Sequence, residues 1–178
     1  MRRPQKTCAI CESGVRVASA VLVLLMLAAC VAADDAKRGV GREFPAMRLP
    51  LLDAAGEVVL PADGPIVLNV WATWCEPCRR EMQALEHLHR AAPGGVRVIG
   101  VSVDADANLA AEFVREQGLT FPNALDARFQ LTDGVLHVDR FPTTFVVDAH
   151  GVVRLREERA RDWANAENVA RVRAALAR

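Results

Sequence analysis

The chain has 178 residues, of which 52% are hydrophobic, and its formal net charge at pH 7 is zero. This length and apolar content are sufficient for one domain with a well-buried core. The balanced charge argues against a nucleic-acid partner, because nucleic-acid binding requires a concentration of basic residues.

The first 29 residues have the pattern of an export signal. Four Lys and Arg residues lie within residues 1–16, and residues 17–29 are apolar apart from Ser19. The apolar run ends in Leu27-Ala28-Ala29-Cys30, which resembles the lipobox of bacterial lipoproteins, where the cysteine is acylated and becomes the new N-terminus. We therefore predict a signal peptide over residues 1–29, lipidation of Cys30, and a tether over residues 30–43.

Two alternatives remain for this segment. Residues 31–33 are also compatible with an ordinary signal peptidase, which would release a free protein beginning at Asp34. Residues 17–33 could instead stay uncleaved as an anchor, although they are short for a membrane-spanning helix. All three interpretations place the following domain in the periplasm.

The five cysteines of the chain fall into separate groups. Cys8 and Cys11 form a C-x-x-C pair inside the basic head, with no strand before it, and we interpret this pair as incidental. If Cys30 is lipidated and the signal is removed, only Cys75 and Cys78 remain as thiols.

The exported domain is predicted to span residues 44–178 and to begin with a β-hairpin. Two apolar stretches, 47–52 and 58–60, flank a turn-forming Asp-to-Gly segment at residues 53–56. Residues 66–71 then form a continuous apolar run, which is typical of a strand buried on both faces.

A helical pattern follows over residues 76–91 and ends at Pro93-Gly94-Gly95. Residues 121–138 give no clear pattern. The remaining elements are predicted to be a strand over 96–103, a helix over 109–117 capped by residues 104–108, hairpin strands over 143–147 and 152–155, and a helix over 164–177. This order predicts an α/β fold with a mixed or parallel sheet covered on both faces.

Cys75 and Cys78 lie where the buried strand meets the following helix. The first N–H groups of a helix have no internal partner and carry partial positive charge, so a thiolate placed there is stabilised and reactive. Cys78 lies three positions after Cys75, which puts the two sulfurs on one helix face. This arrangement predicts a redox-active dithiol, with Cys75 as nucleophile and Cys78 as the deeper, resolving thiol.

Metal binding is the main competing interpretation of the dithiol. His87 and His89 follow Cys78, but the spacing is short for a zinc site and both histidines fall in the same predicted helix. Thiolates also suit Cu(I), but no Met-rich or His-rich segment accompanies the motif. We predict no bound metal and no cofactor other than the Cys75–Cys78 disulfide itself.

Glu76 and Pro77 lie between the two cysteines. Proline suits the first helical turn because it has no N–H group. The charge of Glu76 opposes ionisation of the neighbouring thiol, which destabilises the reduced form and favours a reducing pair. A solvated Glu76 with little influence is the alternative.

The motif Trp74-Cys75-Glu76-Pro77-Cys78 after an apolar strand resembles the thioredoxin superfamily, and within it the TlpA/ResA-like thiol:disulfide oxidoreductases. Phe121-Pro122 and the run from Phe141 to Asp148 fall where that family carries its later motifs. The resemblance covers roughly residues 44 to 176. It implies a thioredoxin fold whose central mixed sheet is flanked by helices, preceded by an N-terminal β-hairpin.

The resemblance also assigns roles to residues around the dithiol. It implies that Glu81 moves protons to and from the buried thiol, whereas an exposed Glu81 paired with Arg80 is the alternative. Asn69 stands where thioredoxin itself has a buried aspartate, and it cannot titrate. Phe141-Pro142-Thr143 resembles the cis-proline loop that packs against the dithiol and binds substrate.

Together these features predict a substrate-binding surface around the dithiol, made by Trp74, Glu76, Pro77, Phe141, Pro142 and Thr143. They predict a membrane-tethered thiol:disulfide oxidoreductase that acts mainly as a reductant. The resemblance implies apocytochrome c or copper-site proteins as substrates and a membrane electron donor of the DsbD/CcdA kind. A disulfide oxidant or isomerase, and a dithiol copper-binding module, are the alternative functions.

Overall fold

A five-stranded mixed sheet forms the centre of the domain, in the order β5-β4-β3-β6-β7. The computed structural model describes residues 39–52 and 54–177, so the predicted signal, the Cys30 lipidation site and most of the tether lie outside the described residues. The strands are β3 (Ile66–Trp71), β4 (Arg97–Ser102), β5 (Asn123–Leu125), β6 (Thr143–Val147) and β7 (Val153–Glu157).

Strands β3, β4 and β5 are parallel, whereas β6 and β7 run antiparallel to their neighbours. Every residue of β3 is buried, as its continuous apolar run predicts for the middle of a sheet covered on both faces. The strand β5 was not predicted, because three residues are too few to establish a period.

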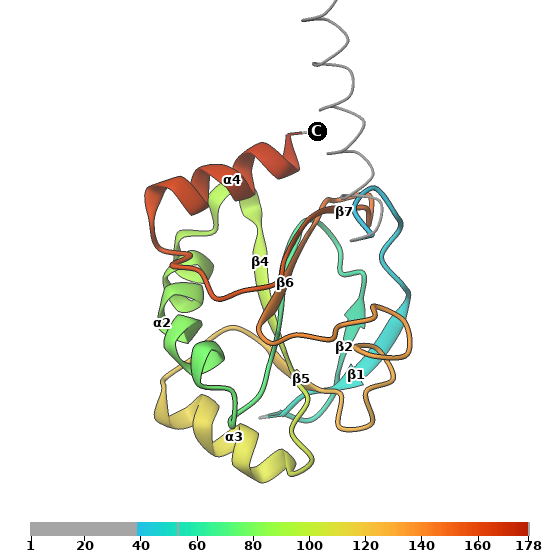
Figure 1. Ribbon diagram of the computed structural model, residues 1–178, viewed down its shortest axis with the longest axis vertical. Helices are drawn as coiled ribbons and strands as arrows, with labels where there is room; N and C mark the ends of the chain where they lie inside the picture. Colours follow the sequence, from blue (N-terminus) through green and yellow to red (C-terminus); the bar gives the residue numbers. More distant parts are fainter. Residues whose placement is uncertain (1–38, 53, 178) are drawn as a thin grey trace, which may run out of the picture. The chain divides into compact units, whose positions relative to one another are not determined.

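Three helices lie on one face of the sheet: α2 (Glu76–Ala91), α3 (Ala107–Glu116) and α4 (Ala166–Leu176) (Figure 1). The helix α2 has the bounds predicted from the sequence, and a short 3-10 turn, η1 (Pro93–Gly95), follows it. The buried face of α2 includes Cys78, Met82 and Leu85. Within the described part of the chain, no helix is both long and apolar enough to cross a membrane.

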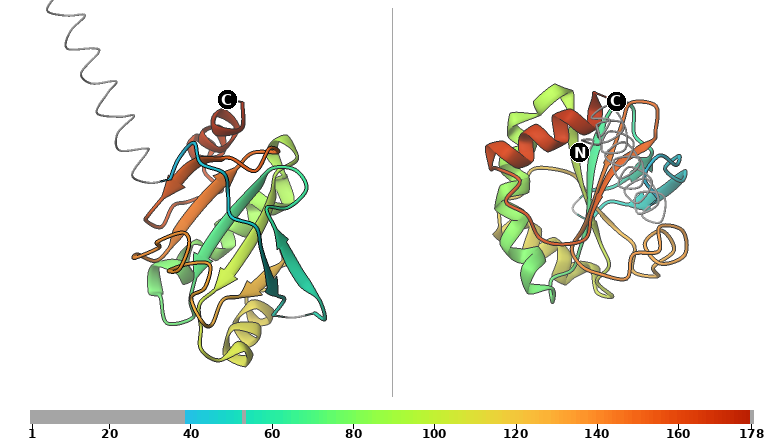
Figure 2. Two further views of the ribbon diagram at one scale, coloured as in Figure 1. Left: turned by 90° about the vertical axis from the view of Figure 1, so that its right-hand side faces the viewer. Right: turned by 45° about the horizontal axis from the view of Figure 1, so that its top comes forward.

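The predicted N-terminal hairpin is present as β1 (Met47–Pro50) and β2 (Glu57–Leu60), and it lies on the sheet face away from the helices (Figures 1 and 2). Leu51 forms a bridge with Ala124, and the Leu52 N–H donates to the Asn123 carbonyl at 2.8 Å. The residues just after β1 thus pair with β5, the edge strand of the central sheet. The last residues of the predicted tether also pair with the domain, since the Gly41 N–H donates to the Val153 carbonyl at 2.7 Å.

A hydrogen bond in the core, between Trp71 and Asn123, requires glycine at position 100. The buried Trp71 side chain packs on Phe113, with 5.3 Å between ring centroids, and its Nε1–H donates to Asn123 Oδ1 at 3.1 Å. The Asn123 side chain reaches Trp71 by crossing Gly100 of β4, where an added Cβ would lie 2.0 Å from Asn123 Oδ1. Only glycine leaves room for this hydrogen bond.

We predict that Gly100→Ala destabilises the domain by about 1–3 kcal/mol, since the new methyl group displaces Asn123 and leaves the indole N–H of Trp71 without its partner. Urea unfolding of the variant measures the loss. The control is Gly100→Ala in an Asn123→Ala background, where no Asn123 side chain can clash and the indole N–H has already lost its partner. Gly100→Ala should cost much less stability in that background, and an equal loss in both backgrounds would show that the clash with Asn123 is not the cause.

Candidate active site

Cys75 and Cys78 are joined by a disulfide at the N-terminal end of α2. Cys75 is the N-cap residue of the helix, and its Sγ accepts the backbone N–H of Cys78 at 3.3 Å. Cys75 is 6% exposed, whereas Cys78 is fully buried. This difference in exposure matches the predicted order, in which Cys75 is the outer sulfur and Cys78 the inner one.

Glu76 and Pro77 occupy the first turn of α2, as predicted. The exposed Glu76 carboxylate lies 3.3 Å from Arg80 and 3.9 Å from Arg79 on the same helix. These exposed ion pairs are weak and screened by solvent, so they balance only part of the charge that Glu76 places beside Cys75.

The loop that carries Trp74 into the dithiol is held by a carboxylate from the neighbouring strand. Asp104, which follows β4, accepts the backbone N–H of Thr73 at 3.0 Å and its hydroxyl at 2.6 Å. The hydroxyl of Ser102 also donates to Asp104, at 2.8 Å. Within the predicted cap over residues 104–108, the N-cap of α3 is Asp106, so Asp104 is not part of the cap itself. Asp104 instead fixes the approach to Cys75.

An apolar surface lies next to the outer sulfur. The Trp74 side chain is 63% exposed and meets the ring of Phe141 edge-on, with 5.6 Å between centroids. This contact joins the dithiol loop to the loop before β6. The Phe141–Pro142 peptide bond is cis, as the resemblance implied, and the buried Thr143 donates its hydroxyl to the Arg140 carbonyl at 2.7 Å.

Glu81 lies on the buried face of α2, one turn after Cys78, and only 3% of the residue is exposed. Its Oε1 accepts Asn69 Nδ2 of β3 at 2.8 Å. Its Oε2 accepts two donors from the segment between β7 and α4, the Arg161 backbone N–H at 2.9 Å and the Trp163 Nε1–H at 3.2 Å. The alternative of an exposed Glu81 paired with Arg80 is therefore wrong.

Burial raises the pKa of Glu81 from 4.5 to about 7. The hydrogen bonds from Arg161, Asn69 and Trp163 favour the charged form and lower the pKa, but they do not outweigh desolvation, and the nearby charge of Glu157 raises it further. A carboxyl group with a pKa near neutrality exchanges its proton readily at physiological pH, which is the property that a general acid or base needs.

No functional signal marks Arg161 and Trp163 in the sequence, where they lie 80 and 82 positions from their partner Glu81. Asn69 was noted only as a group that cannot titrate. It is fully buried and bridges two elements, because its Nδ2 also donates to Thr144 Oγ1 of β6 at 3.0 Å. The Glu81 carboxyl group of α2 is thus held by β3 and by the segment after β7.

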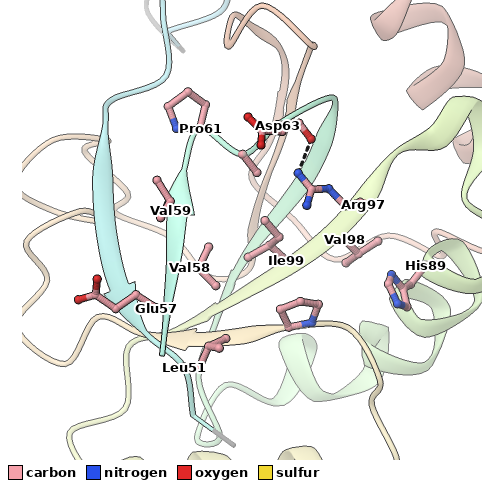
Figure 3. A pocket seen from close by; sticks show the side chains of 12 residues that line it. Leu51, Glu57, Val58, Val59, Pro61, Asp63, His89, Arg97, Val98 and Ile99 are labelled. Carbon is pink, nitrogen blue, oxygen red and sulfur yellow. Dashed lines mark hydrogen bonds between the residues drawn. The ribbon is translucent and has the colours of Figure 1, made fainter. Parts of the chain in front are cut away.

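A hollow of about 580 Å³ lies apart from this site, at the junction of the hairpin and the sheet (Figure 3). Val58 and Val59 of β2 and Ile99 of β4 contribute to its apolar lining. Neither cysteine lines it, so its shape has no direct bearing on the dithiol.

The fold and the site together define a thioredoxin-fold protein with a C-x-x-C disulfide at the head of a helix and a buried carboxyl group one turn behind it. The chain belongs to the Redoxin family, whose model matches residues 39–176.

Individual relatives carry names that agree with the site. The chain is 35% identical to the thiol:disulfide interchange protein DsbE of Escherichia coli K12 over 124 residues, which cover 66% of this chain and 64% of that protein. It is 32% identical to the thiol-disulfide oxidoreductase ResA of Bacillus thuringiensis over 146 residues, or 75% of this chain and 82% of ResA. The chain thus spans a little under two thirds of the DsbE relative.

A solved structure supports the same assignment. A putative thiol:disulfide interchange protein DsbE from Chlorobium tepidum superposes with a TM-score of 0.69 at 27% identity, over 77% of this chain and 97% of that one. The similarity extends over nearly all of the neighbour.

We predict that Glu81 makes the stability of the oxidised protein depend on pH. The folded pKa of about 7 exceeds the ordinary glutamate pKa of 4.5, so the folded state binds one proton more than the unfolded state between these pH values. Stability from protonated Glu81 is therefore fully present below pH 4.5 and is lost as pH rises through 7. Relative to Glu81→Gln, the wild-type chain should lose about 3 kcal/mol across this interval.

Urea unfolding of the oxidised chains between pH 4 and 8.5 measures this difference. Glu76→Gln is the matched control, because it removes an exposed carboxylate from the same helix. The plot of its unfolding free energy against pH should run parallel to that of the wild type. If the plot for Glu81→Gln is also parallel to that of the wild type, Glu81 titrates at its ordinary pKa.

Proposed function

We propose that this chain is a thiol:disulfide oxidoreductase that reduces disulfides in other exported proteins. The observation that carries the proposal is the Cys75–Cys78 disulfide at the N-terminus of α2, with the outer sulfur near the surface and the inner one buried one helical turn before Glu81. The names of the DsbE and ResA relatives support the same reaction class.

In this reaction the Cys75 thiolate, stabilised by the N-terminal end of α2, attacks one sulfur of a substrate disulfide. A mixed disulfide forms, and one substrate thiolate leaves and takes a proton from solvent. Cys78 then loses its proton and attacks Cys75 Sγ, which releases the second substrate thiolate. Two electrons have passed to the substrate, and the Cys75–Cys78 disulfide has formed again.

The charges around the dithiol favour the reducing direction. Glu76 lies beside Cys75, and Glu81 follows Cys78 by one turn, so both carboxylates oppose the build-up of thiolate charge. A pair whose reduced form is poorly stabilised gives up its electrons easily and has a low reduction potential. We therefore assign this protein to the reductants rather than to the oxidants or isomerases.

Cellular placement and partners follow from the sequence signals and the family resemblance. We propose a periplasmic protein attached to the membrane by a lipid on Cys30. Each turnover leaves the disulfide, so a reductant there needs an electron supply, for which a membrane donor of the DsbD/CcdA kind is the candidate. The substrates that fit are apocytochrome c, whose haem-site cysteines must be reduced, and copper-site proteins.

Substrate contact is assigned to the surface beside Cys75. The exposed Trp74 ring and its partner Phe141 supply apolar area, and the cis-Pro142 loop starts the strand β6 next to the dithiol loop. An extended substrate segment is held by such a backbone edge while its disulfide lies over the outer sulfur.

The midpoint potential of the Cys75–Cys78 pair tests the direction of the reaction. We expect a value near or below that of thioredoxin, about −270 mV. The measurement uses the full chain with Cys8, Cys11 and Cys30 replaced by serine, equilibrated with dithiol and glutathione buffers. A strong oxidant has a midpoint potential of about −120 mV, and a value in that region would make this protein a disulfide donor. Absence of a two-electron transition would exclude the enzyme altogether.

We also predict that Trp74→Ala slows reduction of an oxidised Cys-x-x-Cys-His peptide by about tenfold, because the loss of one large apolar contact weakens substrate binding. Its reaction with a small aromatic disulfide, which needs little surface, should change less than the reaction with the peptide. Leu109→Ala is the control, since Leu109 is 55% exposed on α3. Equal slowing with both disulfides would place Trp74 outside substrate recognition.

A further inference from the structure

The resolving step raises the question of where the proton of Cys78 goes. Cys78 is fully buried, and Cys75 is covered by substrate once the mixed disulfide has formed. The surface of Trp74 and Phe141 would be covered at the same time. Under the proposed function, a proton leaving Cys78 therefore needs a route that does not pass through the substrate-binding surface.

A second hollow reaches Glu81 from a different set of residues. It has a volume of about 250 Å³ and lies between α2 and the segment that joins β7 to α4. Its lining consists of Arg80, Glu81, Ala84, Ala160, Arg161 and Asp162. Neither cysteine nor any residue of the predicted substrate-binding surface contributes to it.

The two oxygens of the Glu81 carboxylate face different parts of the protein. Oε1 faces the sheet, where it accepts Asn69, and Oε2 faces the segment that forms the hollow, where it accepts Arg161 and Trp163. Because Glu81 also lines the hollow, this buried group has solvent on one side and the protein core behind α2 on the other.

We propose that this hollow, the α2/160–162 pocket, is a proton port through which Glu81 exchanges protons with solvent while substrate covers the dithiol. The Cys78 thiol gives its proton to the Glu81 carboxylate, and the resulting thiolate attacks Cys75 Sγ and expels the substrate thiolate. The neutral Glu81 carboxyl group then releases the proton to water in the pocket and is charged again. The port deepens the proposed oxidoreductase function and depends on it.

The charges facing Glu81 suit this exchange. Arg80 and Asp162 line the pocket, and Asp162 is exposed. The Arg161 guanidinium is drawn away towards Glu157 of β7, 2.8 Å from its Oε2, so only the Arg161 backbone contacts Glu81. No cation in the described part of the chain forms a salt bridge with Glu81, and its carboxyl group is therefore free to take up and release a proton.

Filling the pocket tests the proposal. Ala84→Leu and Ala160→Leu each narrow it from a different wall and leave all three donors to Glu81 in place. Both are made in the full chain with Cys8, Cys11 and Cys30 replaced by serine. The reduced protein is mixed with excess of the oxidised Cys-x-x-Cys-His peptide, which covers the surface beside Cys75, and samples are quenched with acid at intervals. Formation of the mixed disulfide reports attack by Cys75 in a first, concentration-dependent phase, and its decay reports resolution by Cys78 in a second, concentration-independent one.

We expect each filled variant to slow the second phase by about tenfold or more at pH 7, with the first phase and the midpoint potential unchanged. The ratio of second-phase rates in H₂O and D₂O should rise, because proton release becomes the slow event. Ala91→Leu is the matched control, since Ala91 is exposed at the far end of α2. Normal second-phase rates in the filled variants, or slowing without a larger isotope ratio, would overturn the proposal.

A second measurement decides the matter if a filled variant folds poorly. In Glu81→Ala, added formate should enter the pocket and restore the second phase, whereas failure of formate to restore it contradicts the port. Failure of the proposed function is a different result, because the wild-type protein would then show no second phase at all.

Discussion

Burial of the Glu81 carboxylate is the constraint on which the arrangement of the domain depends. Burying an ionisable group costs free energy unless its oxygens are hydrogen-bonded, and here three donors meet the Glu81 carboxylate. They come from β3 and from the segment after β7, while Glu81 itself belongs to α2. Satisfying one carboxylate therefore fixes the middle strand, the dithiol helix and the entry to the C-terminal helix against one another.

A second carboxylate, Asp104, has a different task, at the loop that precedes the dithiol. It accepts Thr73 and Ser102 at the carboxyl ends of β3 and β4, so it holds the loop that leads into Cys75. Asp104 binds neutral donors at the end of the sheet, whereas Glu81 lies behind the helix with its pKa raised to about 7. The same chemical group is structural in one environment and suited to proton transfer in the other.

The parts of the site that the sequence predicted are those encoded by local patterns. The strand before Cys75, the helix after it and the difference in exposure between Cys75 and Cys78 follow from an apolar run that ends in C-x-x-C. Asp104 and Asp106 both precede α3, and composition alone does not tell which one caps it. The contacts of Trp163 and Arg161 with Glu81 could not be predicted, because they join segments 80 or more positions apart and leave no periodic signal.

This division between local and distant residues has a consequence for how such a protein can change. The surface presented to substrate is built from the Trp74 loop and the Phe141 loop, whereas the surroundings of Glu81 are completed by residues 160–163. If protons leave through the latter, substitutions on the former alter which disulfides are recognised without altering the proton chemistry of Cys78. Conversely, the short segment between β7 and α4, which has no C-x-x-C or cis-proline motif, would set how fast the resolving thiol is deprotonated. The active site then includes the residues along the path of the proton as well as those around the two sulfurs.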